Sequence, residues 1–172
     1  MAKILTVFYS LKGETMGHDM EIVNLEKGYT AMAAELIQKA VGGDIFEIET
    51  VKTYKANHME MINEAKEELD NGIRPELKDY VDIEGYDTIF IGYPNWWRTM
   101  PMPVVGFLEH YDWSGKRIIP FVTSCGGGFG HSLKLIKEIC AGADISSGKD
   151  FLGYQVEESE QAISNWAREA LM

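Results

Sequence analysis

Two adjacent tryptophans, Trp96 and Trp97, are the side chains of this sequence best suited to recognising a flat ligand. They follow an apolar run, Thr88–Ile91, which is typical of a strand buried on both faces. Gly92 and Pro94 stand between, and we expect the regular ladder to stop there because proline has no N–H to donate. Each indole carries about 150–250 Å² of mostly apolar surface. The pair should therefore pack onto a helix or a second subunit, or form a wall for a planar ring system.

A second candidate group follows the apolar run Lys3–Tyr9. The turn from Ser10 to Thr15 is rich in small and hydroxyl residues, and Gly28–Thr30 stands where the first helix should begin. Hydroxyl groups and free amides at a helix N-terminus can hold a phosphate, because the helix dipole favours an anion. No lysine follows at the spacing of a nucleotide-triphosphate loop, and the GxGxxG dinucleotide fingerprint is missing.

A glycine-rich segment, Ser124–Gly130, follows the expected strand Arg117–Thr123 and has four glycines in five residues after Cys125. Glycines let backbone amides approach a polar ring edge closely, because no Cβ intervenes. The alternative is a tight turn before a helix. A phosphate-type turn, an aromatic loop and a glycine loop, all at strand ends, together predict one small molecule with a phosphate tail and a planar head.

No residue is spaced for nucleophilic or metal chemistry. Cys125 and Cys140 form no CxxC pair, and we interpret both as small buried fillers without a disulfide. Cys125 has no sequence-adjacent base, and the histidines are scattered without metal-ligand spacing. We therefore predict no catalytic residue and no metal site.

Strands alternate with helices, which predicts a parallel sheet covered on both faces. Strands are expected at Lys3–Tyr9, Asp44–Glu49, Tyr86–Gly92, Arg117–Thr123 and Phe151–Tyr154. Helices are expected from the N-cap Thr30 to Gly42, and over Asn57–Asn71, Pro101–Leu108, Leu133–Ile139 and Glu157–Leu171. Pro120 lies inside an expected strand, so a bulge or an unpaired amide position is required there. Gly17–Lys27 is interpreted as an insertion, either a solvated loop or one with an extended piece at Glu21–Leu25.

The composition is that of an ordinary globular protein, with 45% hydrophobic and 25% charged residues among 172. We expect a single domain spanning 1–172. The net charge of −11, without a Lys/Arg cluster, argues against binding to nucleic acid or to an anionic membrane and favours basic partner surfaces. No apolar run of about 18 residues occurs, and the chain starts in an expected strand rather than a signal peptide, so a cytoplasmic location is expected.

Over nearly its whole length the chain resembles the flavodoxin-like family. The matching segments are the Tyr9–Ser10 turn with Gly28–Thr30, the Gly-Tyr-Pro-Asn-Trp-Trp loop, and the segment Pro-Phe-Val-Thr-Ser-Cys-Gly-Gly-Gly-Phe-Gly. The two loops are similar to those of one FMN-binding subgroup. The resemblance implies an α/β fold with a three-layer, doubly wound, five-stranded parallel sheet in the order 2-1-3-4-5, and a non-covalent FMN.

The resemblance also implies roles for individual residues. Ser10, Thr15 and Thr30 would hold the phosphate, and the loop from Pro94 to Thr99 would border the ring, with Trp96 or Trp97 against its face. Within that loop, Asn95 best tolerates a positive φ. The complete predicted cofactor-binding set is Ser10, Leu11, Gly13, Thr15, Tyr29, Thr30, Pro94, Asn95, Trp96, Trp97, Thr99, Ser124, Cys125, Gly126, Gly127, Phe129 and Gly130.

Two redox functions follow from this resemblance. The first is an FMN-binding protein that transfers electrons between cytosolic redox partner proteins. The alternative is an FMN-dependent NAD(P)H:quinone-type oxidoreductase using NAD(P)H and a small acceptor, for which Tyr54, Met100, Met102 and the helix Asn57–Asn71 could supply a pocket or a dimer face. The chain would be a monomer or a homodimer. A flavin-free signalling module is disfavoured, because a phosphoacceptor needs aspartates and Phe8–Ser10 offers none.

Overall fold

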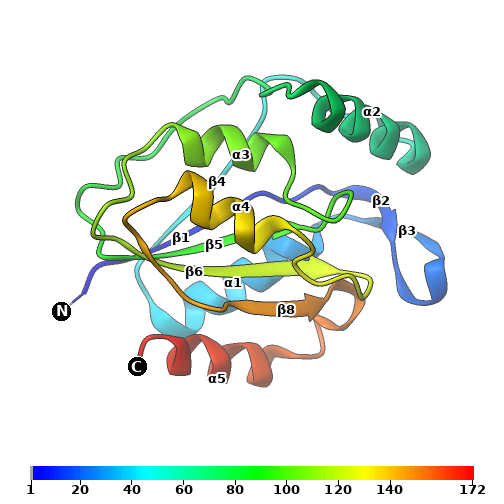
Figure 1. Ribbon diagram of the computed structural model, residues 1–172. Coiled ribbons are helices and arrows are strands. Elements are labelled where there is room, and N and C mark those ends of the chain that lie inside the picture. The colour runs from blue at the N-terminus through cyan, green and yellow to red at the C-terminus, as the bar shows by residue number, and fades with distance from the viewer. Residues whose placement is uncertain (1) are drawn as a thin grey trace.

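A computed structural model describes residues 2–172, and a parallel sheet with helices on both faces forms its centre (Figure 1). The sheet runs in the order β4–β1–β5–β6–β7, with β8 also pairing with β6, and all its pairings are parallel. Its strands are β1 (Ile4–Phe8), β4 (Asp44–Glu47), β5 (Thr88–Pro94), β6 (Arg117–Ser124), β7 (Asp144–Ile145) and β8 (Lys149–Leu152). Because β7 and β8 share the fifth place, the predicted order 2-1-3-4-5 is confirmed.

The helices form two layers, one on each face of the sheet. They are α1 (Tyr29–Val41), α2 (His58–Asn71), α3 (Met102–Glu109), α4 (Ser132–Ile139) and α5 (Glu160–Ala170), with 3₁₀ turns at His18–Met20 and Gly153–Gln155. One core cluster packs α1 and α5 against Phe90, and the other packs α2, α3 and α4 against Ile91. Neighbouring positions of β5 thus enter opposite cores, which is why that strand is apolar without alternation. None of the helices formed by residues 2–172 is long and apolar enough to cross a membrane.

Pro120 sits in β6 opposite the break between β7 and β8. The carbonyl of Ile118 accepts a hydrogen bond from the Ser146 N–H at 3.0 Å. The backbone N–H and C=O groups of even-numbered residues in β6 therefore point toward β7 and β8. β7 pairs with Arg117 and Ile118, and β8 pairs only from Phe121 onward. The absent N–H of Pro120 therefore points to a place where the neighbouring strand is interrupted, which is the unpaired position that the sequence requires.

Two local predictions are wrong. β5 does not stop at Gly92 but pairs with β6 as far as Pro94. A proline is tolerated there because it is the last residue of the strand. The N-cap of α1 is Gly28 rather than Thr30, since the helix begins at Tyr29. A Cβ on Gly28 would lie 2.2 Å from Ser10 Oγ, so only glycine allows the helix start to pack against the turn after β1.

The insertion after β1 is a β-hairpin and not a plain surface loop. β2 (Gly13–Met16) pairs antiparallel with β3 (Ile22–Leu25), which agrees with the expected extended piece near Glu21–Leu25. The second half of the predicted phosphate turn is therefore strand. In Figure 1 the hairpin projects beyond the carboxyl ends of the sheet strands, on the side where α2 also overhangs.

Candidate functional site

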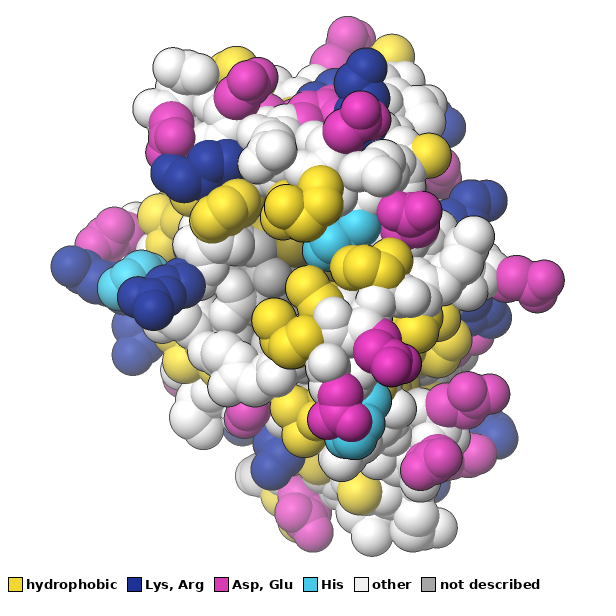
Figure 2. All heavy atoms as spheres, turned by 90° about the vertical axis from the view of Figure 1, so that its right-hand side faces the viewer, with side chains coloured by type: hydrophobic (Ala, Val, Ile, Leu, Met, Phe, Trp, Pro, Cys, Tyr) yellow, Lys and Arg dark blue, Asp and Glu magenta, His cyan; other side chains and the backbone are white. Residues whose placement is uncertain are grey.

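A cavity of about 380 Å³ opens at the carboxyl ends of β1, β5 and β6. The chain crosses from one half of the sheet to the other between β1 and β5, and open α/β sheets bind ligands at this switch point. Figure 2 looks onto this edge and shows hydrophobic side chains gathered around a hollow, with charged side chains mostly toward the periphery. The predicted residues that line the cavity are Ser10, Leu11, Thr15, Tyr29, Thr30, Pro94, Asn95, Trp96, Trp97, Ser124, Cys125 and Gly127.

The tryptophan loop is a tight turn in a strained conformation. Trp96 and Thr99 exchange two backbone hydrogen bonds, of 3.0 and 3.2 Å, across the two residues between them. Those residues, Trp97 and Arg98, have φ of 55° and 64°. Positive φ at both central residues is the signature of a type I′ turn, usually built from Asn and Gly. Asn95, the loop residue that best tolerates a positive φ, does not adopt one, because the turn is centred on Trp97 and Arg98.

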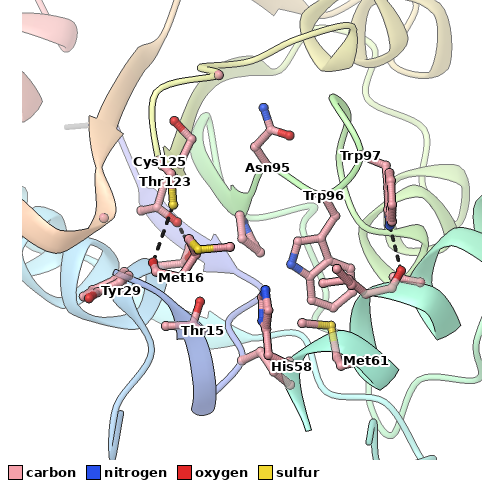
Figure 3. A pocket seen from close by; sticks show the side chains of 18 of the residues that line it. Thr15, Met16, Tyr29, His58, Met61, Asn95, Trp96, Trp97, Thr123 and Cys125 are labelled. Atoms are coloured by element: carbon pink, nitrogen blue, oxygen red, sulfur yellow. Dashed lines mark hydrogen bonds between the residues drawn. The ribbon is translucent and has the colours of Figure 1, made fainter. Parts of the chain in front are cut away.

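The two tryptophans differ in how they are held. Trp96 meets the rings of Tyr9 and Tyr54 edge-on, at centroid distances of 5.5 and 5.4 Å. The indole nitrogen of Trp97 donates to the carbonyl of Ile62 at 2.7 Å, and the side chain remains 42% exposed. Figure 3 shows Trp96 facing the cavity and Trp97 at its side, tied to α2. Trp96 is thus the more enclosed wall and Trp97 belongs to the rim.

Behind Trp96 lies a polar cluster that fixes Tyr54. The hydroxyl of Tyr54 donates to the buried carboxylate of Glu68 at 2.7 Å. Lys52 pairs with the same carboxylate and, at 2.7 Å, with Glu64. Burial, and next the neighbouring Tyr9, raises the pKa of Tyr54 far above its ordinary value. The Tyr54 hydroxyl therefore keeps its proton and donates it in the hydrogen bond to Glu68. This arrangement keeps Tyr54 edge-on to Trp96.

Asn95 joins the tryptophan loop to the glycine loop. Its Oδ1 accepts from the Arg98 N–H at 3.0 Å, and its Nδ2 donates to the carbonyl of Gly128 at 2.7 Å. The carbonyl of Arg98 in turn accepts from the His131 N–H at 2.7 Å, and a Cβ on Gly130 would lie 2.1 Å from that oxygen. The strained turn is therefore held by contacts to the glycine loop on both sides.

The glycine loop uses its amides differently from the sequence interpretation. Ser124 Oγ accepts from the N–H groups of Gly126 and Gly128, at 3.2 and 3.1 Å, so these amides stabilise the loop itself. Of the four glycines, only Gly127 lines the cavity. Positive φ at Gly126, Gly128 and Gly130 explains why the loop needs glycine there.

Five predicted site residues lie outside the cavity lining, namely Gly13, Thr99, Gly126, Phe129 and Gly130. Gly13 begins β2, and Thr99 closes the tryptophan turn. Phe129 packs toward the β7–β8 connection, where a Cβ on Gly148 would lie 2.8 Å from its ring. These residues shape the loops that border the cavity, because their contacts are with other parts of the chain.

The start of α1 faces the cavity next to the turn after β1, as the sequence predicts. Ser10 Oγ accepts the Ala31 N–H at 3.1 Å and so supplies the side-chain cap that Gly28 lacks. Thr30 is 2% exposed, and its hydroxyl is hydrogen-bonded to the hydroxyl of Thr123 at 2.7 Å. In the first turn of α1, the hydrogen-bond donors that remain available to an anion are therefore backbone amides, beginning with that of Tyr29.

Cys125 corrects another expectation, because it is exposed at the cavity whereas Cys140 is buried. The Cys125 thiol donates to the carbonyl of Met16 at 3.5 Å, which links the glycine loop to the β2–β3 hairpin. Partial burial of the sulfur raises the pKa of Cys125 above its ordinary value. A protonated thiol is a small neutral group beside the cavity.

Ten residues that line the cavity are not in the predicted cofactor-binding set, although Arg98 lies in the predicted ring loop and four belong to the helix that the alternative function offered as a pocket. They are Glu14, Met16, Met20, His58, Met61, Ile62, Ala65, Arg98, Thr123 and Gly153. Four of them come from one face of α2, and three from the hairpin and the turn that follows β2. The apolar stripe of α2 was visible in the sequence, but the element opposite that stripe was not. By contrast, Met100 and Met102 are core residues and do not reach the cavity.

A doubly wound parallel sheet with its cavity at the switch point defines the flavodoxin-like class of α/β proteins. The family model described as flavodoxin matches residues 24–170, and the chain belongs to the flavodoxin family. None of the curated proteins matches it.

Solved structures are similar over almost the full length. A protein of Bacteroides eggerthii DSM 20697, provisionally described as a flavoprotein, is 28% identical with a TM-score of 0.76, covering 100% of this chain and 99% of that one. Its counterpart from Bacteroides uniformis ATCC 8492 is 26% identical with a TM-score of 0.75, covering 97% and 98%. A flavoprotein of Lactobacillus acidophilus NCFM in complex with FMN is 20% identical with a TM-score of 0.64, covering 92% and 98%. At that identity the last likeness shows the fold alone.

Proposed function

We propose that this chain binds FMN and works as a redox protein that transfers electrons between partner proteins. The observation that carries the proposal is the meeting of three loops at one cavity. The turn after β1 and the start of α1 provide backbone amides that can bind an anion. The loop after β5 provides a face of Trp96, whose ring is held by its contact with Tyr9. The glycine loop after β6 completes the wall. The FMN complex of the Lactobacillus acidophilus flavoprotein supports this choice of cofactor.

The residues present fit FMN in chemistry as well as in place. The first-turn amides of α1 and the hydroxyl of Thr15 would hold the phosphate. Trp96 would cover a face of the ring, and the segment from Ser124 to Gly127 would lie along its edge. FMN, when bound, supplies electron-transfer chemistry, and the protein positions it and limits water access.

The charge of the chain suits protein partners of the opposite sign. A net charge of −11 attracts basic surfaces and speeds their encounter at low ionic strength. Hydrophobic side chains at the cavity mouth, among them Trp97 and Met20 (70% exposed), would contact a docked partner once it arrives.

The absorption spectrum of the purified protein tests the proposal. We expect the bands of an oxidised flavin, released as FMN when the protein is heated. A colourless preparation that takes up no FMN, with no quenching of its tryptophan fluorescence on addition of FMN, would end the proposal.

A second function, an NAD(P)H-dependent oxidoreductase acting on a small acceptor, is favoured by one observation. The apolar face of α2 forms a cavity wall that the predicted cofactor loops do not need. Mixing the FMN-loaded protein with NADPH and a quinone separates the two functions. Sustained turnover without any other protein identifies an enzyme, and a chain that turns over only when a reductase is added is an electron carrier.

A further inference from the structure

Two buried tyrosines contact the indole ring of Trp96 from behind the cavity. The ring centroid of Tyr54 lies 5.4 Å from that of Trp96, and the ring centroid of Tyr9 lies 5.5 Å from it. Trp96 itself lines the cavity, and Figure 3 shows its ring facing the open space, where a small oxidant can reach it. Aromatic rings in direct contact exchange electrons readily, because the rate of transfer falls steeply with distance. Either tyrosine is therefore close enough to give an electron to an oxidised Trp96.

The contact between Trp96 and Tyr54 also connects two cavities. Trp96 lines the cavity at the carboxyl ends of the strands, and Tyr54 lines a second one of about 400 Å³. The turn after β1 and the residues that follow β4 border this second cavity, together with Lys52, whose Nζ lies 4.3 Å from the centroid of the Tyr54 ring. Two adjacent rings thus form a path along which an electron can cross from the wall of one cavity to the wall of the other.

The two tyrosines differ in the partner of the hydroxyl group. Tyr54 donates to the buried carboxylate of Glu68 at 2.7 Å, and Lys52 pairs with the same carboxylate. The hydroxyl of Tyr9 is buried too, but no carboxylate among residues 2–172 accepts its hydrogen. A tyrosine that loses an electron becomes a very strong acid, so its oxidation needs a base within hydrogen-bond reach that takes the proton. Of the two tyrosines, Tyr54 has such a base.

We infer that Tyr54 is a redox-active tyrosine, which gives an electron to Trp96 after a one-electron oxidant in the cavity has oxidised that indole. One electron leaves the Tyr54 ring and returns the Trp96 radical cation to the neutral indole. The hydroxyl proton of Tyr54 passes to Glu68, and the products are a neutral tyrosyl radical and a carboxylic acid. The step moves an oxidising equivalent out of the cavity. It goes beyond the proposed function and does not require FMN, because any one-electron oxidant that reaches Trp96 starts it.

The chain contains a matched aromatic pair that lacks the base. Tyr111 contacts Trp113 edge-on at a centroid distance of 5.4 Å, the same as between Tyr54 and Trp96. The hydroxyl of Tyr111 accepts from the Val81 N–H at 3.0 Å, and no carboxylate accepts from it in the part of the chain that the structure describes. Trp113 is buried, so an oxidant in solution reaches it less readily than it reaches Trp96. This pair therefore has the ring geometry of the path without its proton acceptor.

Pulse radiolysis of the full-length protein tests the step. The azide radical oxidises tryptophan selectively, and the absorption bands of oxidised tryptophan and of the tyrosyl radical are then followed at neutral pH. In the wild type we expect the tyrosyl band to grow as the tryptophan band decays, at a rate that does not depend on protein concentration. Tyr54→Phe and Trp96→Phe should each abolish this growth. Tyr9→Phe and Tyr111→Phe are the matched controls and should leave it unchanged.

Glu68→Gln tests the proton acceptor, because the amide oxygen can still accept from the Tyr54 hydroxyl but is not a base. We expect the tyrosyl radical to form about a hundredfold more slowly in this variant. Deuterium oxide should slow the step in the wild type as well, a measurement that needs no variant to fold.

Three outcomes would each overturn the inference. They are tyrosyl growth that survives in Tyr54→Phe, growth that is lost equally in Tyr111→Phe, and an unchanged rate both in Glu68→Gln and in deuterium oxide. The azide radical supplies the oxidising equivalent in all of these measurements. A chain that binds no FMN would therefore refute the proposed function and leave this test intact.

Discussion

The side-chain amide of Asn95 donates to the carbonyl of Gly128 at 2.7 Å, across 33 residues of sequence. The other end of the same amide accepts from Arg98, inside the turn that carries Trp97. One side chain therefore sets the distance between the aromatic loop and the glycine loop. The width of the cavity at this point depends on it.

Replacing Asn95 by alanine should loosen both loops. With each hydrogen bond contributing about 1 kcal/mol, we expect a loss of about 2 kcal/mol in the free energy of unfolding and about tenfold weaker FMN binding. Denaturant unfolding and flavin titration measure the two effects. Asn165→Ala removes a comparable side-chain contact, with Gln161 on α5, and should change neither quantity appreciably. Unchanged FMN affinity in Asn95→Ala would contradict the role given to this residue.

Arg98→Gly should stabilise the protein. The φ of 64° at Arg98 strains a residue with a Cβ but not glycine. We therefore expect the free energy of unfolding of Arg98→Gly to be about 1 kcal/mol higher than that of the wild type. Arg98→Val should have the opposite sign, since a β-branched residue is strained at positive φ. Arg168→Gly, inside α5, serves as the control and should destabilise by about 1 kcal/mol. Destabilisation by Arg98→Gly would mean that its side-chain contacts outweigh the backbone strain.

Trp96 and Trp97 should contribute unequally to FMN binding. Trp96 is held edge-on by two tyrosines and lies deeper, whereas Trp97 is at the exposed rim. We expect Trp96→Ala to weaken FMN binding at least tenfold, given about 0.5–1.5 kcal/mol for ring stacking beyond the loss of buried area. Trp97→Ala should have a smaller effect. Fluorescence titration measures both, and the reverse ranking would identify Trp97 as the wall.

Lys52→Met should destabilise the fold by leaving Glu68 buried without its cation. Removing one partner of a buried pair typically costs about 3–5 kcal/mol, and we expect about 2 kcal/mol because Lys52 is about a third exposed. The control, Lys39→Met, breaks an exposed pair with Glu160 and should cost less than about 0.5 kcal/mol. An equal cost for both variants would refute the special role of Glu68.

The stabilising effect of Lys52 should depend on pH in a defined direction. Burial alone would lower the pKa of Lys52, but its hydrogen bonds with Glu64 and Glu68 raise it above the ordinary value. The Glu64 pKa is lowered in return, because the same partner outweighs its burial. Because the Lys52 pKa is raised in the folded protein, its contribution to stability is complete below the ordinary lysine pKa and is lost at higher pH. Because the Glu64 pKa is lowered, its contribution is complete above the ordinary carboxyl pKa and is lost in acid. The difference in unfolding free energy between wild type and Lys52→Met should therefore be largest between about pH 5 and 10.

Alkylation of thiols should report the environment of the two cysteines. Cys125 is exposed with a raised pKa, so iodoacetamide should modify it slowly at pH 7 and faster as the pH is raised. Burial raises the pKa of Cys140 to about 12, and that thiol should not react in the folded protein. Mass spectrometry of the digested protein distinguishes the sites, and loading with FMN should slow the modification of Cys125. Rapid modification of Cys125 at pH 7 would show a stabilised thiolate instead.

The sheet was predictable because its strands are short apolar runs with clear breaks. Thr88–Ile91 is apolar on both faces and could only be a central strand. An extended piece at Glu21–Leu25 was expected, but its pairing with Gly13–Met16 was not. These two strands pair only with each other, and neither carries a pattern that requires this pairing. The turn at Trp97 and Arg98 was equally hidden, since the residues in it are among those least suited to positive φ.

The sequence by itself determined the layers, the strand order expected from the family resemblance, and the three loops at the strand ends. Only the tertiary structure decided which groups of those loops face the cavity. Thr30 reaches Thr123, and Trp97 reaches Ile62, through contacts between segments distant in the chain. The periodicity of a helix such as α2 specifies which side is apolar, but it carries no information about the element that lies opposite. The sequence therefore offered this helix as a possible pocket, and only the structure places its face with His58 at the cavity.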